Sequence, residues 1–237
     1  MQLKIKNDFA AIADDLTGAI DVGAQFHRSG YEVVIFNYRN KAKETAAPGD
    51  IIVVNTQSRE NTVEVSREKI VEASRFLRER GVRRIFLKID SAFRGNTVAA
   101  ISALIDEMKL QTALVAPAIP EMKRITVGGY QLFGQIPIER THYSKDPFYP
   151  VKESHIPTLL ANRTGRKVEH VELSLIMKKC AILGLRNAIK EGANIVVADA
   201  VSEEDLNHIA ESAYELGMLD LTVGSLGLAR AVLRALN

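Results

Sequence analysis

Charge of one sign is the first thing that this 237-residue sequence lacks. Its 31 Lys and Arg against 29 Asp and Glu leave a formal net charge of +2. It therefore has no overall positive field of the kind that attracts nucleic acid. Cysteine occurs once, as Cys180, which excludes an intrachain disulfide and a multi-cysteine zinc site and fits a reducing, cytoplasmic setting. Cys180 stands in the middle of a predicted helix, and we expect it in the core.

Long hydrophobic runs and nucleotide signatures are also missing. The first eight residues lack the apolar centre of a signal peptide, and no run approaches the ~20 apolar residues that a membrane span needs. There is no GxxxxGK followed by Ser or Thr, and no GxGxxG after a strand. The five histidines show no metal-ligand spacing. We therefore expect a soluble protein without nucleic acid, membrane or bound metal, and without a complete nucleotide site.

The segments that are present alternate between strand and helix character. Apolar residues make up 46% of the chain, enough for a large core. The expected strands are 9–13, 31–36, 51–55, 84–89, 112–116, 168–173, 194–198 and 220–223. The expected helices start at Ala19 or cover 61–80, 97–109, 154–162, 174–191, 202–216 and 228 to the end. This order predicts an α/β fold with a mostly parallel open sheet flanked by helices, in one domain over 1–237. A β-hairpin around Gly134-Gln135 and a polar loop form an insertion at about 125–150.

Polar and charged side chains gather after two of the expected strands. Asp14 and Asp15 follow the first strand, and Thr17 and Gly18 fit the turn into the next helix. The strand 84–89 ends with Lys88 and runs into Asp90, Ser91, Arg94 and Asn96. Since parallel strands bring their carboxyl ends to one edge of the sheet, we expect the two groups to share a site. Arginine and lysine suit a carboxylate or phosphate, and Ser and Asn suit hydroxyls, so the mixture favours a polyhydroxy acid. The alternatives are a helix cap at Asp14-Asp15 and a simple ion pair between Asp90 and Arg94 or Lys88.

Two further segments add candidates. Lys123-Arg124-Ile125-Thr126 carries positive charge after another strand end and is predicted to close over an acidic ligand, or to be a solvated turn. Gly224-Ser225-Leu226-Gly227 joins the last strand to the last helix. Backbone amides there could accept a phosphate, which makes Gly224, Ser225 and Gly227 cofactor-binding candidates; the alternative is a tight connection.

Together these motifs resemble the four-carbon acid sugar kinases, formerly a domain of unknown function, which include threonate and oxo-tetronate kinases. The resemblance is to their amino-terminal, sugar-binding domain. It rests on Ile12-Ala13-Asp14-Asp15-Leu16-Thr17-Gly18-Ala19, on Lys88-Ile89-Asp90-Ser91 with Arg94-Gly95-Asn96, on Val115-Ala116-Pro117-Ala118 with Arg124 and Thr126, and on Asp146-Pro147 with Pro150, Val151 and Ser154-His155. The segment 223–229 resembles the one that closes this domain.

The resemblance implies a division of roles. Asp15 or Asp90 would orient the attacking hydroxyl as catalytic residues, with Asp14 a third candidate. Lys88, Arg94 and Arg124 would hold carboxylate or phosphoryl oxygens, and Ser91 and Asn96 would bind hydroxyls. The other substrate-binding residues that it implies are Asp14, Thr17, Gly18, Thr126, Lys145, Asp146 and His155. Where the family usually reads Ser-Thr-Leu-Arg-Gly-Asn, this chain has Ser-Ala-Phe-Arg-Gly-Asn from Ser91, so the identity of the sugar acid stays open.

Cofactor and partners follow from the same resemblance. Family members continue into a second domain that binds ATP, whereas this chain stops at Asn237. We therefore expect ATP and Mg²⁺ to bind only with a second domain or a separate nucleotide-binding chain, in a homo- or hetero-oligomer. If a second domain docks near 223–236, we expect an exposed apolar surface there. Two other functions remain open: a sugar-acid-binding or sensor domain without catalysis, and a metal-dependent hydrolase that uses the carboxylates.

Overall fold

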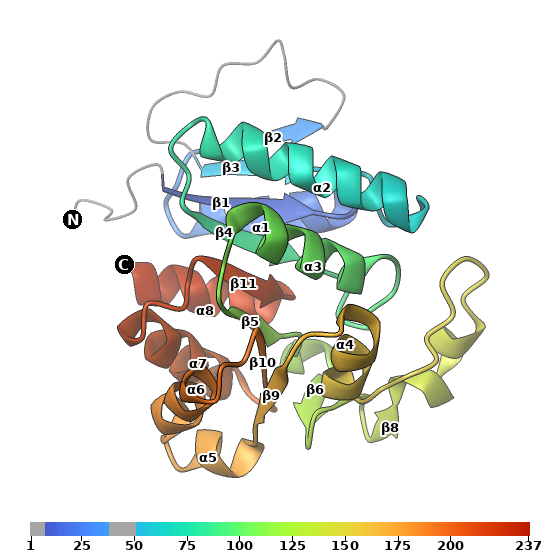
Figure 1. Cartoon of the computed structure of the whole chain (residues 1–237), viewed down its shortest axis with the longest axis vertical. Coiled ribbons are helices and arrows are strands. Elements are labelled where there is room, and N and C mark those ends of the chain that lie inside the picture. The colour runs from blue at the N-terminus through green and yellow to red at the C-terminus, as the bar shows by residue number, and fades with distance from the viewer. Residues whose placement is uncertain (1–7, 38–50) are drawn as a thin grey trace.

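A single parallel sheet organises the molecule. The computed structural model describes residues 8–37 and 51–237, and Figure 1 shows how their strands and helices are arranged. The sheet has eight strands in the order β2-β3-β1-β4-β11-β5-β10-β9, and each neighbouring pair runs parallel. The strands are β1 (Phe9–Ala13), β2 (Val33–Asn37), β3 (Ile51–Asn55), β4 (Arg84–Lys88), β5 (Ala113–Ala116), β9 (Val168–Val171), β10 (Ile195–Ala198) and β11 (Leu221–Gly224). The predicted α/β class and parallel open sheet are confirmed.

Helices cover both faces of this sheet. One face carries α1 (Leu16–Arg28), α5 (Leu173–Met177), α6 (Ala181–Lys190), α7 (Glu203–Glu215) and α8 (Leu226–Leu236). The other carries α2 (Val63–Arg78), α3 (Thr97–Met108) and α4 (Ile156–Thr164). In β1, Phe9, Ala11 and Ala13 join the first core, and Ala10 and Ile12 join the second. Since side chains alternate along a strand and both faces are covered, the strand reads as an unbroken apolar run.

The sheet order changes direction between β1 and β4. After β1 the chain passes through α1 to β2, at one edge of the sheet, and after β4 it passes through α3 toward β5 on the other side. Helices α1 and α3 lie on opposite faces, while β1 and β4 are neighbours with Ala13 opposite Lys88. In open parallel sheets, this reversal leaves a crevice at the carboxyl ends of the two strands. The segments that follow β1 and β4 both begin there.

The insertion after β5 is larger than a hairpin. It forms a separate antiparallel sheet of β6 (Arg124–Val127), β7 (Tyr130–Phe133) and β8 (Ile136–Pro137). The predicted hairpin corresponds to β7 and β8, and β6 joins through the turn at Gly128 and Gly129, both at positive φ. Short 3₁₀ turns precede and follow this sheet: η2 (Pro120–Met122), η3 (Ile138–Arg140) and η4 (His142–Lys145). The last of these lies in the polar loop.

Two sequence-based expectations were wrong. The helix predicted over 174–191 is two helices, α5 and α6, because Lys179 adopts a φ of +57° and the Cys180 N–H closes α5 on the Leu175 carbonyl (2.9 Å). Cys180 is therefore a half-buried N-cap of α6, neither in mid-helix nor in the core.

The last helix bears on where a second domain could dock. Helix α8 packs against α1 and α7 with its large apolar side chains buried or half-buried, so residues 223–236 do not form the exposed apolar surface that docking there would need. Within residues 8–37 and 51–237, no helix has both the length and the apolar character that a membrane crossing requires.

Candidate functional site

The turn after β1 places two carboxylates where the sheet order reverses, between β1 and β4. Asp15 is the N-cap of α1, and its Oδ1 accepts the Gly18 N–H at 2.7 Å. Asp14 is buried, whereas the Asp15 side chain keeps 28% of its surface exposed. A Cβ on residue 18 would lie 2.7 Å from Asp15 Oδ1 and 3.3 Å from Lys88 Nζ. Glycine at this position thus lets both side chains approach the start of the helix, and the helix cap that the sequence offered as the alternative is present.

Arg59, which the sequence analysis missed, binds both of these carboxylates. It follows β3, the strand next to β1. Its Nε and Nη2 donate to the two oxygens of Asp14, each at 2.8 Å, and its Nη1 donates to Asp15 Oδ2 at 2.5 Å. The Asp14 carbonyl in turn accepts the N–H groups of Ser58 and Arg59 at 2.9 and 3.2 Å. Both carboxylate oxygens of Asp14 are therefore occupied by one guanidinium.

Burial and charge oppose each other in this pair. Burial raises the pKa of Asp14 above its usual value, although the hydrogen bonds and charge of Arg59 act to lower it. Burial also disfavours the charged form of Arg59, but its hydrogen bonds and charge interactions with Asp14 and Asp15 outweigh this and raise its pKa. The charge of Asp90 also raises the pKa of Arg59, so the loop after β3 and the segment after β4 interact electrostatically.

A second arginine organises the segment after β4. Arg94 donates from Nε to Asp90 Oδ2 at 2.7 Å, from Nη2 to Asp90 Oδ1 at 3.3 Å, and from Nη1 to Asp146 Oδ2 at 3.2 Å. Burial opposes ionisation of Asp90, but the hydrogen bonds and charge of Arg94, with the charge of Arg59, hold the pKa of Asp90 below its usual value. The polar loop thus brings Asp146 to this strand end, and the predicted Asp90–Arg94 pair is present.

Lys88 and Asn96 donate to backbone carbonyls, whereas Arg59 and Arg94 bind carboxylates. Lys88 is 7% exposed, and its Nζ donates to the Ile89 carbonyl at 3.0 Å. Among the described residues, no carboxylate lies within ion-pair distance of this ammonium. Asn96 is half-buried and donates to backbone carbonyls of the Arg59 loop, that of Asn61 at 2.7 Å and that of Ser58 at 3.2 Å. Its amide therefore supports the loop, while Lys88 keeps hydrogen-bonding capacity.

Tyr143 links the insertion to the Arg94 cluster and was likewise missed. Its hydroxyl accepts a hydrogen bond from Arg124, and its ring centroid lies 5.3 Å from the Arg94 Cζ and 5.5 Å from the Arg124 Cζ. Arg124 has a buried Nε without a hydrogen-bond partner among the described residues. The insertion thus brings Arg124 to the same tyrosine ring that Arg94 contacts, and its closing over an acidic ligand stays a prediction.

Two other predicted residues act as supports of the insertion. Thr126 is buried and donates to Gln131 Oε1 at 2.7 Å. Gln131 Nε2 then donates to the Ser91 carbonyl at 2.8 Å, and Ser91 itself is buried. This chain of hydrogen bonds fastens the small sheet to the segment after β4, so Thr126 and Ser91 hold the two parts of the candidate site together.

The remaining predicted residues lie away from this cluster or in its margin. His155 is the N-cap of α4, with its Nδ1 2.6 Å from Thr158 Oγ1 and its ring 4.7 Å from that of Tyr130. Thr17 is exposed in the first turn of α1, and Lys145 is exposed in η4. Their roles in substrate binding stay predictions.

The turn at Gly224-Ser225-Leu226-Gly227 is used for packing. Ser225 is buried, and its Oγ donates to the Ala118 carbonyl at 2.6 Å. A Cβ on Gly224 would lie 2.6 Å from the Ala116 carbonyl oxygen, and one on Gly227 would lie 2.9 Å from that of Ala118. The tight connection that the sequence offered as the alternative is therefore present, and a phosphate contact at this turn stays a prediction.

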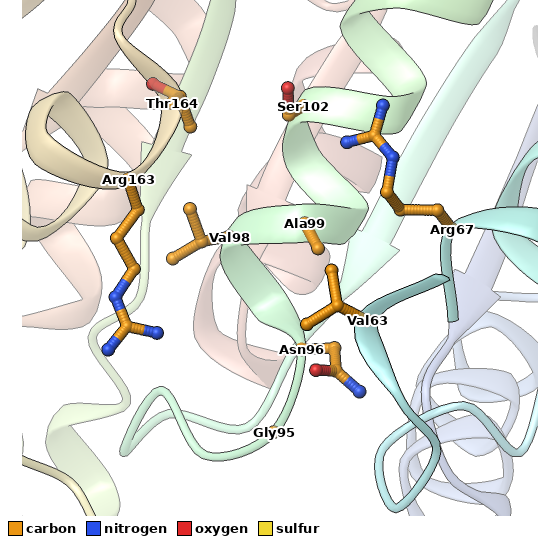
Figure 2. A pocket seen from close by; sticks show the side chains of 9 residues that line it. All are labelled: Val63, Arg67, Gly95, Asn96, Val98, Ala99, Ser102, Arg163 and Thr164. Carbon is orange, nitrogen blue, oxygen red and sulfur yellow. The ribbon is translucent and has the colours of Figure 1, made fainter. Parts of the chain in front are cut away.

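A cavity of about 480 Å³ borders the candidate site. It lies between α2, α3 and α4, and it shares Gly95 and Asn96 with the segment after β4. Figure 2 shows Arg67 and Arg163 on either side of α3, with the apolar side chains of Val63, Val98 and Ala99 between them. The carboxylates described above do not line this cavity. In the described part of the chain, no three His, Cys, Asp or Glu side chains gather closely enough to hold a metal ion.

Comparison with known proteins places the chain in a family. Residues 9–232 match the model of a family described as the sugar-binding N-terminal domain. The chain is 32% identical over 222 residues to D-threonate kinase from Salmonella typhimurium and 34% identical over 211 residues to D-erythronate kinase from Heliobacterium modesticaldum. These matches cover 93% and 87% of this chain but 52% and 48% of those proteins. The chain thus spans about half the length of the curated relatives it matches.

A solved structure supports the same relationship. It is the crystal structure of a protein from Bordetella bronchiseptica, a domain-swapped dimer with bound citrate. Its sequence is 29% identical to this one, the TM-score is 0.82, and the match covers 96% of this chain and 56% of that one.

Proposed function

Since the chain belongs to the family of sugar-binding N-terminal domains, we propose that it binds a four-carbon sugar acid at the carboxyl edge of the sheet, between β1 and β4. The curated relatives are named for kinases of D-threonate and D-erythronate, and the Bordetella structure holds citrate, another hydroxy acid. A ligand of this class carries one carboxylate and several hydroxyls, and it needs a cation together with hydrogen-bond acceptors.

The observation that carries this proposal is the ammonium of Lys88. An ammonium has three donors, and the one acceptor described for this Nζ is the carbonyl of Ile89. A buried charge is costly unless it is paired or hydrogen-bonded, so the carboxylate of a ligand is a favourable partner for it. Arg124, whose described polar partners are Tyr143 and the sulfur of Met122, supplies a second cation for carboxylate or phosphoryl oxygens.

The carboxylates differ in how much of each is free to receive a hydroxyl. Arg59 occupies both oxygens of Asp14, and Arg94 occupies both oxygens of Asp90. The oxygens of Asp15 also accept one hydrogen bond each, from Gly18 and Arg59, so exposure separates the three groups: the Asp15 side chain is 28% exposed, against 11% for Asp14 and 12% for Asp90. We therefore assign to Asp15 the role of orienting the reacting hydroxyl as general base. Asp90 then serves to hold Arg94.

As the relatives are kinases of about twice this length, we further propose that the chain supplies the acceptor side of a phosphoryl transfer. Such a reaction needs a group that orients the hydroxyl and cations that stabilise charge on the phosphoryl oxygens. ATP and the Mg²⁺ that bridges its phosphates would then come with another domain or a separate nucleotide-binding chain. The domain-swapped dimer of the Bordetella protein supports an oligomeric arrangement.

Calorimetric titration with D-threonate and D-erythronate tests the binding proposal. We expect Lys88→Met to weaken binding at least tenfold, since a charge-assisted hydrogen bond contributes about 1.5–3 kcal/mol. Lys190→Met, which removes an exposed lysine of α6, is the matched control and should bind as the parent does. If the parent binds neither acid, or if the Lys88 variant binds equally well, the proposal is wrong.

Turnover tests the second part. The chain is mixed with ATP, Mg²⁺ and each acid, with and without a candidate nucleotide-binding chain, and ADP formation is followed. Turnover in the complete mixture supports the kinase role, and Asp15→Asn should abolish it without abolishing binding of the acid. Tight binding without turnover under any pairing supports the sensor instead. Metal-dependent phosphatase activity of the chain alone would contradict the kinase proposal.

A further inference from the structure

Arg59 makes three hydrogen bonds through its side chain, and neither the sequence motifs nor the proposed function assigns it a role. Its side chain is 18% exposed, and its three hydrogen bonds reach two consecutive carboxylates, Asp14 and Asp15. A guanidinium is planar, and its two parallel bonds to Asp14 fix the orientation of that plane. The third bond, from Nη1, then reaches Asp15 from a fixed direction.

The backbone of Arg59 is held by both halves of the site. From the side of β1, the Asp14 carbonyl accepts the N–H groups of Ser58 and Arg59. From the side of β4, Asn96 Nδ2 contacts the carbonyls of Ser58, Arg59 and Asn61 at 3.2, 3.4 and 2.7 Å. This loop is therefore fastened at both strand ends, which fixes the backbone from which the Arg59 side chain extends.

We infer that Arg59 is a positioning residue, which holds the carboxylate of Asp15 in the orientation in which it meets the sugar hydroxyl. This inference rests on the proposed function. The two fixed partners of Asp15 are Arg59 Nη1 on Oδ2 and the Gly18 N–H on Oδ1, so its torsion angles are set from both sides. Holding a general base close to the productive geometry is a large part of what a site contributes to a reaction.

The charges around the acidic turn give this inference a measurable signature. Asp14 faces Asp15 on its own segment, Arg59 on the loop after β3 and Lys88 on β4. If Arg59 is removed, two adjacent carboxylates lose the cation that binds both of them, and Asp14 stays buried. A neighbouring like charge and burial both disfavour ionisation, so the pKa of Asp14 should rise further above its usual value.

The test compares Arg59→Gln, Arg59→Lys and a control, Arg83→Gln, which removes an exposed arginine next to the amino end of β4. Carboxyl ¹³C NMR titration measures the pKa of Asp14 directly. We expect the pKa of Asp14 to rise by about one unit or more in Arg59→Gln. The rise should be smaller in Arg59→Lys, whose ammonium keeps the charge but lacks the paired donors of the guanidinium, and the control should show none.

Binding of D-erythronate, measured by calorimetry at pH 5 and pH 7, completes the test. Affinity should fall at least tenfold in Arg59→Gln, more at pH 5 than at pH 7, and recover in part in Arg59→Lys. An unchanged Asp14 titration or unchanged affinity in a folded variant overturns the inference. If Arg59→Gln does not fold, the Arg59→Lys comparison decides alone. If the parent binds no sugar acid, the proposed function fails, whereas the NMR titration still shows whether Arg59 controls Asp14.

Discussion

The Gly95→Ala substitution tests the close contact between the segment after β4 and Arg59. Gly95 has a φ of +78°, and a Cβ there would lie 2.7 Å from Arg59 Cγ and 3.2 Å from the Arg59 carbonyl oxygen. The left-handed conformation costs an alanine about 1 kcal/mol. Forcing a methyl group into a filled space costs about 1–3 kcal/mol more. We therefore expect the free energy of unfolding to fall by about 2–4 kcal/mol.

Gly192→Ala is the matched control for this experiment. Gly192 has a φ of +76°, but a Cβ there would meet nothing within 4 Å, so the variant should lose only the conformational cost of about 1 kcal/mol. Urea unfolding of the two variants and the parent gives both differences. The affinity for D-erythronate should also fall in Gly95→Ala, because the added methyl group displaces Arg59, and should be unchanged in Gly192→Ala.

Two outcomes would refute this reasoning. Equal losses of stability in the two variants would mean that the contact with Arg59 yields at no cost. A Gly95→Ala protein that is destabilised but binds sugar acid as the parent does would mean that the position of Arg59 does not affect the site.

Two further predictions concern charge and hydrogen bonding. Because Arg94 holds the pKa of Asp90 below its usual value against the effect of burial, this carboxylate stabilises the fold at neutral pH, and the stabilisation is lost as pH falls below about 4 through its folded pKa. Asp90→Asn should therefore lose less stability between pH 6 and pH 3 than the parent; equal losses in urea midpoints would contradict this. Tyr143→Phe removes the hydrogen-bond acceptor of Arg124 and should weaken sugar-acid binding about fivefold, since a typical hydrogen bond contributes about 1 kcal/mol. Calorimetry that finds unchanged affinity would exclude Tyr143 from the site.

The parallel sheet could be predicted because its signals are local. Both β1 and β3 occupy the residues expected of them, since a short apolar run between polar segments is distinctive when both faces of a strand are buried. The break between α5 and α6 could not be predicted from the same signals. It occurs at Lys179, a residue without the conformational freedom of glycine or the ring of proline, and it depends on how α5 and α6 pack against the sheet.

The candidate site was predictable only in part. Asp14, Asp15, Lys88 and Asp90 stand directly at strand ends, so their placement followed from the α/β pattern alone. Arg59 follows β3 by four residues, and its importance depends on β3 lying next to β1, an order that the sequence analysis did not establish. A systematic inspection of the segment after each parallel strand would have included it.

Tyr143 offered even less of a signal. It was visible as one polar residue among several in the loop after the insertion, and its contacts with Arg94 and Arg124 depend on how that loop folds back. The identity of the residues that such a loop brings together is a tertiary property, which spacing along the chain does not encode.

The small antiparallel sheet is attached to the large sheet by a few hydrogen bonds. The buried Asp199 holds the β6–β7 turn, because its oxygens accept the N–H groups of Gly128 and Gly129 at 2.7 and 3.0 Å. The central strand, β7, is joined to the segment after β4 by the hydrogen bond from Gln131. These anchors use the ends of parallel strands and leave the strands themselves untouched. The sequence of the insertion can therefore change without a change in the sheet, provided that Asp199 and Gln131 are retained.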